Sequence, residues 1–361
     1  MDFKRYNRQI ILHDFGKEAQ DKLFRSRVLV VGAGGLGCPV LQCLASAGVG
    51  YLGIVDFDKV EITNLHRQIL YKEGDVGKLK SLAAKERLEE TNSESTITSY
   101  SEKLNVKNIS SIIDSYNIIV DCTDNFQTRY LLNDYCQIKN LPLVYGAIYQ
   151  YEGQIAVFNV EKDGMKTNYR DLFPFPPKLS EVPTCNETGV LGTLTGIIGT
   201  IQANEVIKLI SGIGNPLIHK LMIFNSLDYN TRMINFAKSK INSSPKDEDE
   251  FKTIYYEHIC GMFTTINEVE SVFQLKEILS RKNSILVDVR NEDEIPKISG
   301  FEYMLIPLYI HEEKINILDD YDSIIFVCNS GLRSKRAIEI AKEKFPQKDI
   351  RHIHNGIEMI S

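Results

Sequence analysis

A glycine-rich segment near the N-terminus has the spacing of a phosphate-binding loop. Gly32-Ala-Gly34-Gly35-Leu-Gly37 follows the apolar run 28–31, which predicts a buried strand, and precedes a segment with helical spacing. In a strand–turn–helix context, glycines let the backbone approach a phosphate group and direct its N–H groups at it. Asp56 ends the next predicted strand, where a carboxylate can accept hydrogen bonds from both ribose hydroxyls. These residues predict a nucleotide site, and taken alone they are most typical of a dinucleotide-dependent enzyme.

Polar residues after other predicted strands favour phosphate chemistry over hydride transfer. Asn64-Leu65-His66-Arg67-Gln68 follows Asp56 closely, Lys80 opens a predicted helix, and Asp121-Cys122-Thr123-Asp124-Asn125 ends a later strand. The carboxyl ends of parallel strands meet at one edge of a sheet, where ligands bind. Cations and hydrogen-bond donors would therefore converge there with a carboxylate. Hydride transfer has no use for this set, whereas phosphate chemistry does.

A second cluster of reactive side chains lies near the C-terminus. Cys328-Asn-Ser-Gly-Leu-Arg333 joins a predicted strand, 322–327, to a predicted helix. The dipole at a helix N-terminus and a nearby arginine both favour a thiolate over a thiol. A buried structural cysteine is the alternative, but the helix N-terminus and Arg333 together favour a nucleophile.

Alternating strand-like and helix-like patterns must position these residues. Such alternation predicts an α/β fold with a mostly parallel sheet that is covered on both faces. In the first part of the chain, the predicted strands are 27–32, 51–58, 117–125 and 142–148, and the predicted helices are 36–47, 77–92, 126–140 and 188–209. An irregular segment, 161–187, is too long for a simple connection, and such loops are usually functional.

The length of 361 residues predicts two domains. The polar, charged segment 237–252 has the composition of a linker. After it, strands are predicted at 284–290, 301–308, 322–327 and 349–354, with a helix at 334–345. We therefore expect a first α/β domain over residues 1–240, a linker over 241–262, and a smaller α/β domain over 263–361.

The charge balance excludes some classes of partner. With 42 Lys and Arg against 48 Asp and Glu, the net charge is −6, which argues against direct binding of nucleic acid or of an anionic membrane. The N-terminus has no apolar signal region, and the uncharged stretch 28–55 is too rich in glycine to favour a membrane helix. Seven cysteines, an odd number, indicate thiols in a cytoplasmic protein.

Several separated motifs carry a family resemblance. The motifs are RYNRQI at 5–10, GAGGLG, DFD, NLHRQ, the turn at 77–80 and DCTDN. Together they resemble, over residues 4–236, the adenylating enzymes that activate ubiquitin-like proteins, among them the molybdopterin-synthase and thiamine-biosynthesis adenylyltransferases and the ubiquitin-activating E1 enzymes. The resemblance implies a Rossmann-like, E1-type adenylation domain. In this family, the C-terminal carboxylate of a small protein attacks the α-phosphorus of ATP.

The resemblance also implies roles for individual residues. Arg67 and Lys80 would hold the phosphates, Asp124 would ligate Mg²⁺ on them, and Asp56 would hold the ribose. Arg8 would reach the phosphates of the neighbouring subunit in a homodimer. The full set expected to bind ATP is Gly32, Gly34, Gly35, Gly37, Asp56, Asp58, Thr63, Asn64, Leu65, His66, Arg67, Gln68, Lys80, Asp124 and Asn125.

Simpler interpretations exist for single residues. Arg8, Arg67 and Lys80 could each be a solvated surface charge, and the Asp124-Asn125 pair could be a helix cap. Their combination at matching strand ends favours the adenylation site.

Two features of the resemblance leave questions open. Many relatives hold a structural zinc with two CxxC pairs, but the corresponding segments here are 168–171 and 257–260, which contain only Cys260 and His258 as zinc-binding types. We therefore expect no structural zinc. In some relatives, the residue matching Cys185 forms an acyl-disulfide or a thioester with the activated partner. In others it is dispensable, and both interpretations stay open. Cys38, Cys43, Cys122 and Cys136 are expected to be small core residues.

The second cluster resembles rhodanese domains over about residues 263–361. Asp288-Val-Arg290, the segment 298–307 and the loop from Cys328 to Arg333 carry the resemblance, whereas Pro296-Lys297 departs from it. Related phosphatases have five residues between the cysteine and the arginine, and the four here favour sulfur. The resemblance implies that Cys328 carries a persulfide, made by a donor such as a cysteine desulfurase. Its terminal sulfur would convert an adenylated carrier protein, ending in Gly-Gly, to the thiocarboxylate.

Alternative functions keep or replace this chemistry. The carrier could serve molybdopterin, thiamine or cysteine synthesis or tRNA thiolation. A dinucleotide-dependent oxidoreductase is a rival of another class, and the NLHRQ and DCTDN motifs argue against it. A conjugating enzyme without sulfur transfer, or an inactive scaffold, is disfavoured by the intact Cys328 loop.

Overall fold

The computed structural model describes residues 3–176, 189–254, 256, 267–329, 332–353 and 356–360. These residues form two compact units, one of residues up to 256 and one of residues from 267 onward. Each unit has its own buried hydrophobic clusters. Both units have α/β architecture, as the alternating patterns predict.

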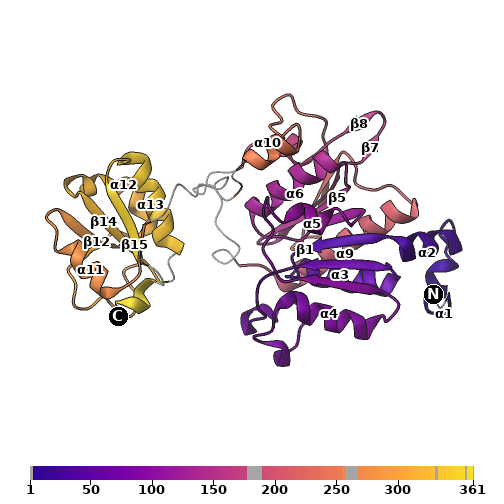
Figure 1. Cartoon of the computed structure of the whole chain (residues 1–361), viewed down its shortest axis with the longest axis horizontal. Helices are drawn as coiled ribbons and strands as arrows, with labels where there is room; N and C mark the ends of the chain where they lie inside the picture. The colour runs from indigo at the N-terminus through magenta and orange to yellow at the C-terminus, as the bar shows by residue number, and fades with distance from the viewer. Residues whose placement is uncertain are drawn as a thin grey trace. The chain divides into compact units, whose positions relative to one another are not determined.

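The first unit is built on an eight-stranded sheet (Figure 1). The strand order across the sheet is β10-β9-β6-β5-β4-β1-β2-β3. Strands β3, β2, β1, β4 and β5 pair in parallel, and β6, β9 and β10 extend the sheet in antiparallel pairing. The bounds are β1 Arg27–Val31, β2 Tyr51–Val55, β3 Thr96–Tyr100, β4 Ile118–Asp121, β5 Leu143–Tyr149, β6 Glu152–Phe158, β9 Lys220–Asn225 and β10 Thr231–Asn235.

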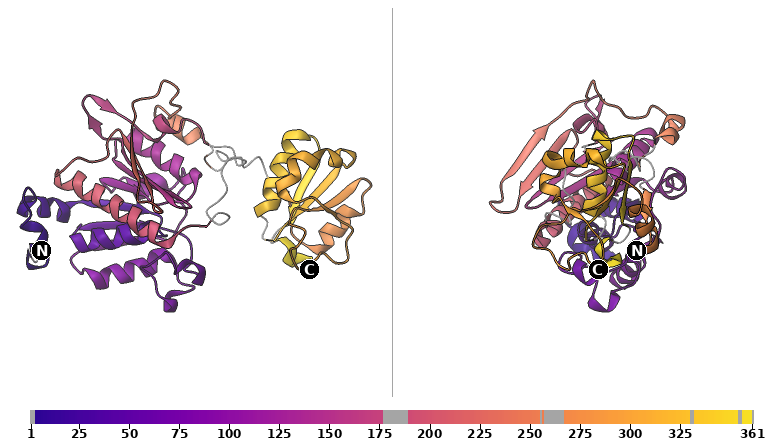
Figure 2. Two further views of the ribbon diagram at one scale, coloured as in Figure 1. Left: turned by 180° about the vertical axis from the view of Figure 1, so that it is seen from behind. Right: turned by 90° about the vertical axis from the view of Figure 1, so that its left-hand side faces the viewer.

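Helices cover both faces of this sheet, as Figures 1 and 2 show. The central strands are apolar on both sides, so both faces need a cover. Val28 and Val30 lie in the cluster formed with α2, α3, α4 and α9, whereas Leu29 and Val31 lie in the cluster formed with α5, α6, α7 and α10. The bounds are α2 Gly16–Arg25, α3 Gly37–Ala47, α4 Lys80–Thr91, α5 Ile109–Ile113, α6 Phe126–Lys139, α7 Tyr169–Leu172, α9 Gly192–Ser211 and α10 Glu248–Thr253. A further helix, α1 (Phe3–Ile10), precedes α2.

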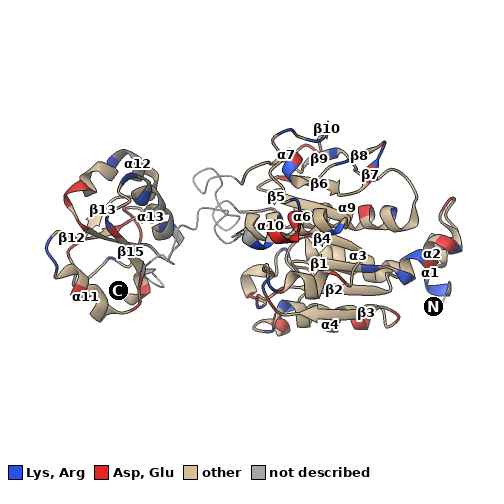
Figure 3. Ribbon diagram, turned by 45° about the horizontal axis from the view of Figure 1, so that its top comes forward, with Lys and Arg blue, Asp and Glu red and all other residues tan. Residues whose placement is uncertain are grey.

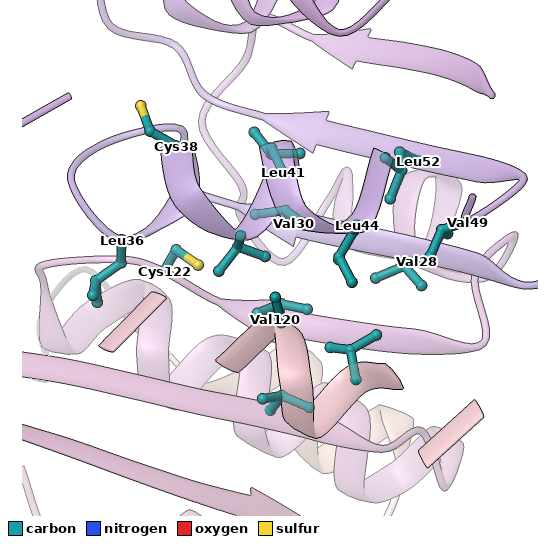
Figure 4. Close-up of a cluster of buried hydrophobic side chains, with 14 of the residues drawn as sticks. Val28, Val30, Leu36, Cys38, Leu41, Leu44, Val49, Leu52, Val120 and Cys122 are labelled. Carbon is teal, nitrogen blue, oxygen red and sulfur yellow. The ribbon is translucent and has the colours of Figure 1, made fainter. Parts of the chain in front are cut away.

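The contact between α3 and the sheet fixes the glycine-rich segment. Figure 4 shows Val30 of β1 and Val120 of β4 close to Leu41 and Leu44 of α3. All four side chains are fully buried. Burial of one such side chain stabilises the fold by about 1.5–3 kcal/mol. The turn between β1 and α3 is therefore held at both of its ends.

The segment after α9 and β10 differs from the composition-based prediction of a linker. Residues 239–254 lie on the first unit: the Ser239 N–H donates to Asp171 Oδ1 (2.8 Å), Asn242 Nδ2 donates to the same atom (2.7 Å), and Phe251 is only 2 % exposed. Polar side chains here form hydrogen bonds to other polar residues, which composition does not reveal. The position of a linker after residue 256 stays a prediction.

The long segment after β6 contains short elements before it leaves the described part of the chain. Strands β7 (Glu161–Lys162) and β8 (Met165–Lys166) form a small hairpin that precedes α7. Residues 177–188, which include Cys185, lie outside the described residues. The prediction of a core helix at 188–209 is confirmed by α9, with Leu194 and Ile198 fully buried.

The second unit is a five-stranded parallel sheet with the order β11-β15-β14-β12-β13. Phe326 of the central strand lies in a cluster with α13, and its neighbour Val327 lies in a cluster with α11. Of the predicted strand 301–308, only two residues form β13, because the chain then turns into the short 3₁₀-helix η5 (Leu308–Ile310). The bounds are β11 Asn267–Val269, β12 Ser284–Asp288, β13 Met304–Leu305, β14 Ser323–Val327, β15 Asp349–Ile353, α11 Val272–Leu279, α12 His311–Lys314 and α13 Leu332–Lys344.

The described ranges contain no helix with the length and apolarity needed to cross a membrane. Within the same ranges, five cysteines are free thiols: Cys38, Cys43, Cys122, Cys136 and Cys328. Burial raises the pKa of the Cys38 thiol to about 12 and also raises the pKa of Cys122 and Cys136. These three residues are core side chains, as expected, and burial disfavours their reactive thiolates.

Candidate functional site

The glycine-rich turn after β1 needs its glycines for close backbone packing. Gly32 has a φ of +93°, and a Cβ atom on it would lie 2.7 Å from the carbonyl oxygen of Cys122. A Cβ on Gly37 would lie 1.9 Å from the carbonyl oxygen of Gly32. A Cβ on Gly35 would lie 2.9 Å from a methyl carbon of Thr195. The turn is thus compressed between β4 and α9, while a Cβ on Gly34 would meet only Gln68 Nε2, at 3.7 Å.

Asp56 ties the glycine-rich turn to the end of β2. Its Oδ2 accepts a hydrogen bond from the Ala33 N–H (2.8 Å), and its Oδ1 accepts one from the Asp58 N–H (2.9 Å). Burial raises the pKa of the Asp56 carboxyl, while the charge of Lys80 opposes the rise. Each carboxylate oxygen has a second lone pair. Asp56 can therefore position the turn and still accept ribose hydroxyl groups.

Lys80 is a buried cation at the N-terminus of α4. Its side chain is 8 % exposed, and its Nζ donates to Asp58 Oδ2 at 3.0 Å. Its backbone N–H also donates to the Asp58 carbonyl oxygen. The segments 56–59 and 79–80 are therefore held together, and the Lys80 ammonium lies at the same strand end as Asp56.

The NLHRQ segment lies between this cation and α9. Asn64 ends the short helix η1 (Ile62–Asn64) and is buried, as is Gln68. Among the described residues, Gln68 Oε1 has no hydrogen-bond partner, although Gln68 is only 4 % exposed and lies beside Gly34. A buried acceptor without a partner is costly, so a ligand donor that reaches Gln68 Oε1 would stabilise it. Gln68 is therefore the strongest local indication of a bound ligand.

Arg67 is held by its own segment and by α9. Its Nη1 donates to the Thr63 carbonyl oxygen (3.1 Å) and lies 2.7 Å from His66 Nε2. Its carbonyl oxygen accepts from Thr195 Oγ1 (3.3 Å), and Thr195 also touches Gly35. Thr195 therefore links the Arg67 backbone to the glycine-rich turn, whereas the Arg67 guanidinium contacts its own segment. Leu65 packs partly buried against the core.

The end of β4 is shaped by a buried ion pair that the sequence analysis did not identify. Asp121 is fully buried and accepts hydrogen bonds from Arg129 Nε (3.1 Å) and from Thr123 Oγ1 (2.6 Å). Arg129 also donates to the Thr123 carbonyl oxygen (2.8 Å). This network fixes the turn that presents Asp124, which is exposed. Asn125 is the N-cap of α6, since its Oδ1 accepts from the Thr128 N–H.

Arg8 lies far from the glycine-rich turn of its own chain. Its neighbour Gln9 donates to the carbonyl oxygen of Ala47, the last residue of α3, whereas Gly37 is the first. A helix of 11 residues is about 16 Å long. Figure 1 shows α1 beyond α2, at the end of the sheet where β1 starts, and Figure 3 shows the cations on α1. The structure therefore does not bring Arg8 together with Arg67 and Lys80 within one chain.

Cys328 directly follows β14 in the second unit and is 1 % exposed. Residues 330 and 331 of its loop lie outside the described residues. The guanidinium of Arg333 is held by both carboxylate oxygens of Glu294, at 2.5 and 2.7 Å. Hydrogen bonds from Arg333 lower the pKa of Glu294 to about 2. Much of the charge of Arg333 is thus already compensated, which the sequence analysis did not anticipate because Glu294 belongs to no motif.

A second bidentate pair supports the same loop region. Arg290 is 1 % exposed, donates to both oxygens of Asp288, and donates through Nη1 to the Pro296 carbonyl oxygen (2.9 Å). Asp288 and Arg290 therefore fix the edge where Pro296-Lys297 departs from the rhodanese pattern.

No cluster of three or more acidic, histidine or cysteine side chains that could hold a metal ion occurs in the described ranges. Asn168 and Asp171 hold the segment 239–244 through hydrogen bonds. His258 and Cys260 lie outside the described residues, so the expectation of no structural zinc stays a prediction.

Comparisons with known proteins match each of the two units to a family. The family model described as the ThiF family matches residues 6–245, and the one described as Rhodanese-like domain matches residues 271–361. The chain is 37 % identical to "Adenylyltransferase and sulfurtransferase MOCS3" of Drosophila sechellia, over 99 % of this chain and 82 % of that relative. It is 39 % identical to the protein of the same name from Drosophila grimshawi, over 99 % of this chain and 83 % of that relative.

Solved structures share the fold of the first unit. A crystal structure of E. coli MccB with MccA-N7isoASN has a TM-score of 0.59 at 24 % identity, covering 68 % of this chain and 74 % of that one. E. coli MccB with ATP has a TM-score of 0.56 at 22 % identity, covering 65 % and 75 %. The matched family model covers most of the chain, and the relatives cover nearly all of it. The chain therefore belongs to the ThiF family and carries a rhodanese-like domain after its ThiF domain.

Proposed function

We propose that the chain activates the C-terminal carboxylate of a small ubiquitin-like sulfur-carrier protein with ATP, and then converts it to a thiocarboxylate with sulfur from Cys328. Its family and its relatives make it an adenylyltransferase and a sulfurtransferase. The observation that carries the proposal is the meeting of the glycine-rich turn, Asp56, Lys80 and the unpartnered Gln68 at one strand edge. A cysteine loop at a helix N-terminus in the same chain supplies the second activity.

The first reaction needs positive charge and positioning but no general base. An α-carboxyl group titrates near about 3.5, so the carrier's terminus is already a carboxylate at neutral pH. One of its oxygens bonds to the α-phosphorus of ATP while the bond to the bridging oxygen breaks, and pyrophosphate leaves with the electron pair. The obstacle is the approach of an anion to a polyanion, which fixed cations relieve.

The residues of the first site divide this work. Backbone N–H groups of the glycine-rich turn bind phosphate oxygens, Asp56 accepts the ribose hydroxyls, and Lys80 and Arg67 neutralise the phosphates. Gln68 and Asn64 add polar contacts from the buried side. Asp58 holds Lys80 in place before ATP arrives, since it already pairs with the ammonium.

Asp124 is suited to a magnesium ion carried in with ATP. Its carboxylate is exposed at the strand edge, and the described part of the chain records no ion pair to it. Carboxylate and phosphate oxygens are the ligands that Mg²⁺ prefers. The ion would neutralise charge that develops on the leaving pyrophosphate.

The full site requires a second copy of the chain. Because α1 holds Arg8 at the far end of α3, Arg8 would contribute its charge to the neighbouring subunit in a homodimer. Phe3, Ile11 and Leu12 are exposed apolar side chains beside it, which suits a surface covered by another subunit.

The second reaction transfers sulfur through Cys328. A persulfide donor, such as a cysteine desulfurase, places one sulfur atom on the Cys328 thiolate. The terminal sulfur then attacks the acyl-adenylate carbonyl, a carbon–sulfur bond forms, and AMP leaves. A thiol cleaves the resulting acyl-disulfide, which releases the thiocarboxylate and leaves a disulfide on Cys328. Cys185 is a candidate for that thiol within the chain.

The carrier is expected to be of the molybdopterin-synthase small-subunit type, in agreement with the name of the relatives. Carriers for thiamine, cysteine or tRNA thiolation would undergo the same chemistry. We expect a cytoplasmic location and no direct contact with nucleic acid.

Pyrophosphate–ATP exchange in the presence of a recombinant molybdopterin-synthase small subunit tests the first half. Asp124→Asn should lower the exchange rate by about 10²-fold, whereas the matched change Asp249→Asn, at a side chain that is 96 % exposed, should leave it unchanged. Equal exchange by both variants would remove Asp124 from the site. For the second half, Cys328→Ser should retain exchange but yield no thiocarboxylate by mass spectrometry, and undiminished product would refute the sulfur assignment.

A further inference from the structure

Behind Cys328, four polar side chains form a continuous hydrogen-bonded chain. Cys328 Sγ lies 3.5 Å from Ser334 Oγ, Ser334 Oγ lies 3.4 Å from His352 Nδ1, and His352 Nε2 lies 3.1 Å from Glu268 Oε1. Cys328, Ser334 and His352 are each at most 1 % exposed, and the Glu268 side chain is 27 % exposed. This series of hydrogen bonds therefore links a buried thiol to a carboxylate near the surface.

The parallel sheet places these side chains. Glu268 of β11 and His352 of β15 are register partners, so their side chains share one face of the sheet. His352 is also the partner of Phe326 on β14, and Phe326 packs in the cluster beneath α13. Ser334 stands in the first turn of α13, directly after the cysteine loop. Residues from three separate elements, β11, β15 and α13, thus form one hydrogen-bonded series with the thiol.

We propose that Ser334, His352 and Glu268 are positioning residues that take the proton of Cys328 and hold the resulting thiolate. The inference rests on the proposed function, because it assumes that Cys328 is the sulfur-carrying residue. The S–H bond of Cys328 breaks as its proton passes to Ser334 Oγ, and the Ser334 hydroxyl proton passes to His352 Nδ1. The products are a thiolate that accepts a hydrogen bond from Ser334 and an imidazolium whose Nε2–H donates to Glu268. No other proton or electron is required.

The surrounding charges favour this role for His352. Arg333 is bound by both oxygens of Glu294, and Arg290 by both oxygens of Asp288, so the two arginines near the loop have much of their charge compensated. A cation close by adds to the helix dipole in favouring a buried thiolate.

Of the other titratable groups on these elements, Arg333 interacts electrostatically with Cys328, but Glu294 already holds its guanidinium through both carboxylate oxygens. His311, on the same face against Phe326, has its pKa lowered by burial to about 4 and stays neutral. Arg351 and Asp349, on β15 itself, pair with each other. A buried imidazolium is stable only when it is paired, and Glu268 provides its partner. The Cys328 thiolate and the His352 imidazolium therefore stabilise each other as an ion pair that is bridged by Ser334.

The pH dependence of Cys328 alkylation tests the inference without carrier, ATP or sulfur donor. The full chain is treated with iodoacetamide from pH 5.5 to 9.5, and mass spectrometry follows the Cys328 peptide. Wild type should show a midpoint below the ordinary thiol value of about 8.5. Ser334→Ala, His352→Gln and Glu268→Gln should each raise the midpoint by about one unit, a roughly tenfold loss of rate at pH 6.5. The matched change Glu270→Gln, at an exposed residue just beyond β11, should behave as wild type.

The plateau rate at high pH separates positioning from structural damage. If a side chain acts by taking the proton of Cys328, its loss moves the midpoint of alkylation and leaves the plateau rate unchanged. If its loss distorts the loop, the plateau rate falls. An unmoved midpoint in His352→Gln, a lowered plateau without a shift, or a wild-type midpoint at the ordinary thiol value would each overturn the inference.

A second measurement tests the pair if the Ser334, His352 or Glu268 variants do not fold. In ¹⁵N-histidine NMR of the full chain, Cys328→Ser should lower the titration midpoint of His352 by about one unit, because the imidazolium loses its thiolate partner. An unchanged midpoint would contradict the pair. If the midpoints shift as expected but Cys328→Ser still yields thiocarboxylate, the proposed sulfur transfer fails while the ionisation pair stands.

Discussion

A single methyl group at Gly37 tests the geometry of the first site most directly. A Cβ atom there would lie 1.9 Å from the Gly32 carbonyl oxygen and 3.6 Å from Cys122 Cβ. Favourable contacts between heavy atoms lie near about 3.5 Å, so the start of α3 and the end of β1 would have to separate by roughly 1.5 Å. A Cβ atom on Gly32 would itself lie 2.7 Å from the Cys122 carbonyl oxygen, so Gly32 has little free space on that side.

The expected effect of Gly37→Ala is larger on catalysis than on folding. Overpacking in a tight region costs about 1–3 kcal/mol of unfolding free energy, and the surrounding helix contacts stay intact. A displacement of about 1 Å at a reacting group can lower a rate by about 10²-fold. The N–H groups that would bind the phosphates belong to the displaced turn, so pyrophosphate exchange should fall by at least that factor.

The assay is pyrophosphate–ATP exchange with a carrier protein, together with urea denaturation of each variant. Gly74→Ala is the matched control, because Gly74 is exposed and a Cβ atom there meets no atom within 4 Å. It should retain full exchange and full stability. Exchange by Gly37→Ala within threefold of wild type would show that the turn does not hold the phosphates.

Two further predictions concern buried charges. Asp121→Asn removes the counter-charge of Arg129, which is 6 % exposed, so the free energy of unfolding should fall by about 3–5 kcal/mol. Combining it with Arg129→Met should recover most of that loss. Urea denaturation of the two single variants and the double variant measures these free energies, and a double variant that recovers no stability would show that the pair is unimportant. Burial lowers the pKa of His311 to about 4. Because this folded-state pKa lies below the unfolded value of about 6.5, the second unit should be fully stable above pH 6.5 and lose up to about 3 kcal/mol as the pH falls towards 4. His311→Leu should abolish this slope in pH-dependent unfolding, and a slope that persists would contradict the assignment.

The parts of the molecule that the sequence predicts well are those determined by neighbours along the chain. The glycine spacing at 32–37, the apolar strand before it and the acidic strand end at Asp56 lie within 30 residues of one another. Their meeting follows from the parallel β1–β2 pairing, which the alternating pattern already implies. The α/β fold and the meeting of these residues at one strand edge were therefore predictable from local patterns.

The ion pairs that support both sites depend on contacts between distant residues. Glu294 is 39 positions from Arg333 and belongs to a segment without strand or helix periodicity. The sequence predicts that Arg333 stabilises a thiolate at Cys328. Because Glu294 already pairs with Arg333, this contribution is smaller than the motif alone indicates. No spacing rule along the chain identifies such a partner.

Composition misled the interpretation of the polar segment after β10 for a related reason. Polar residues predict a linker when they face water, but Asn242 and Ser239 donate hydrogen bonds to Asp171 instead. The few apolar residues of this segment, Phe251 and Ile254, are enough to anchor it in the cluster beside α6. A segment with low hydrophobicity can thus be ordered when its polar groups find internal partners.

The two candidate sites handle their cations in a common way. Lys80 is paired with Asp58 and Arg333 with Glu294, so each candidate cation already has a carboxylate partner. For Lys80 the carboxylate is single and half-exposed, so an incoming polyphosphate can share the ammonium without a large desolvation cost. For Arg333 the pairing is bidentate, so a substrate anion must compete with two charge-assisted hydrogen bonds. The first arrangement suits a site that binds a highly charged nucleotide. The second suits a loop whose arginine is held in place by Glu294 while it also acts electrostatically on Cys328.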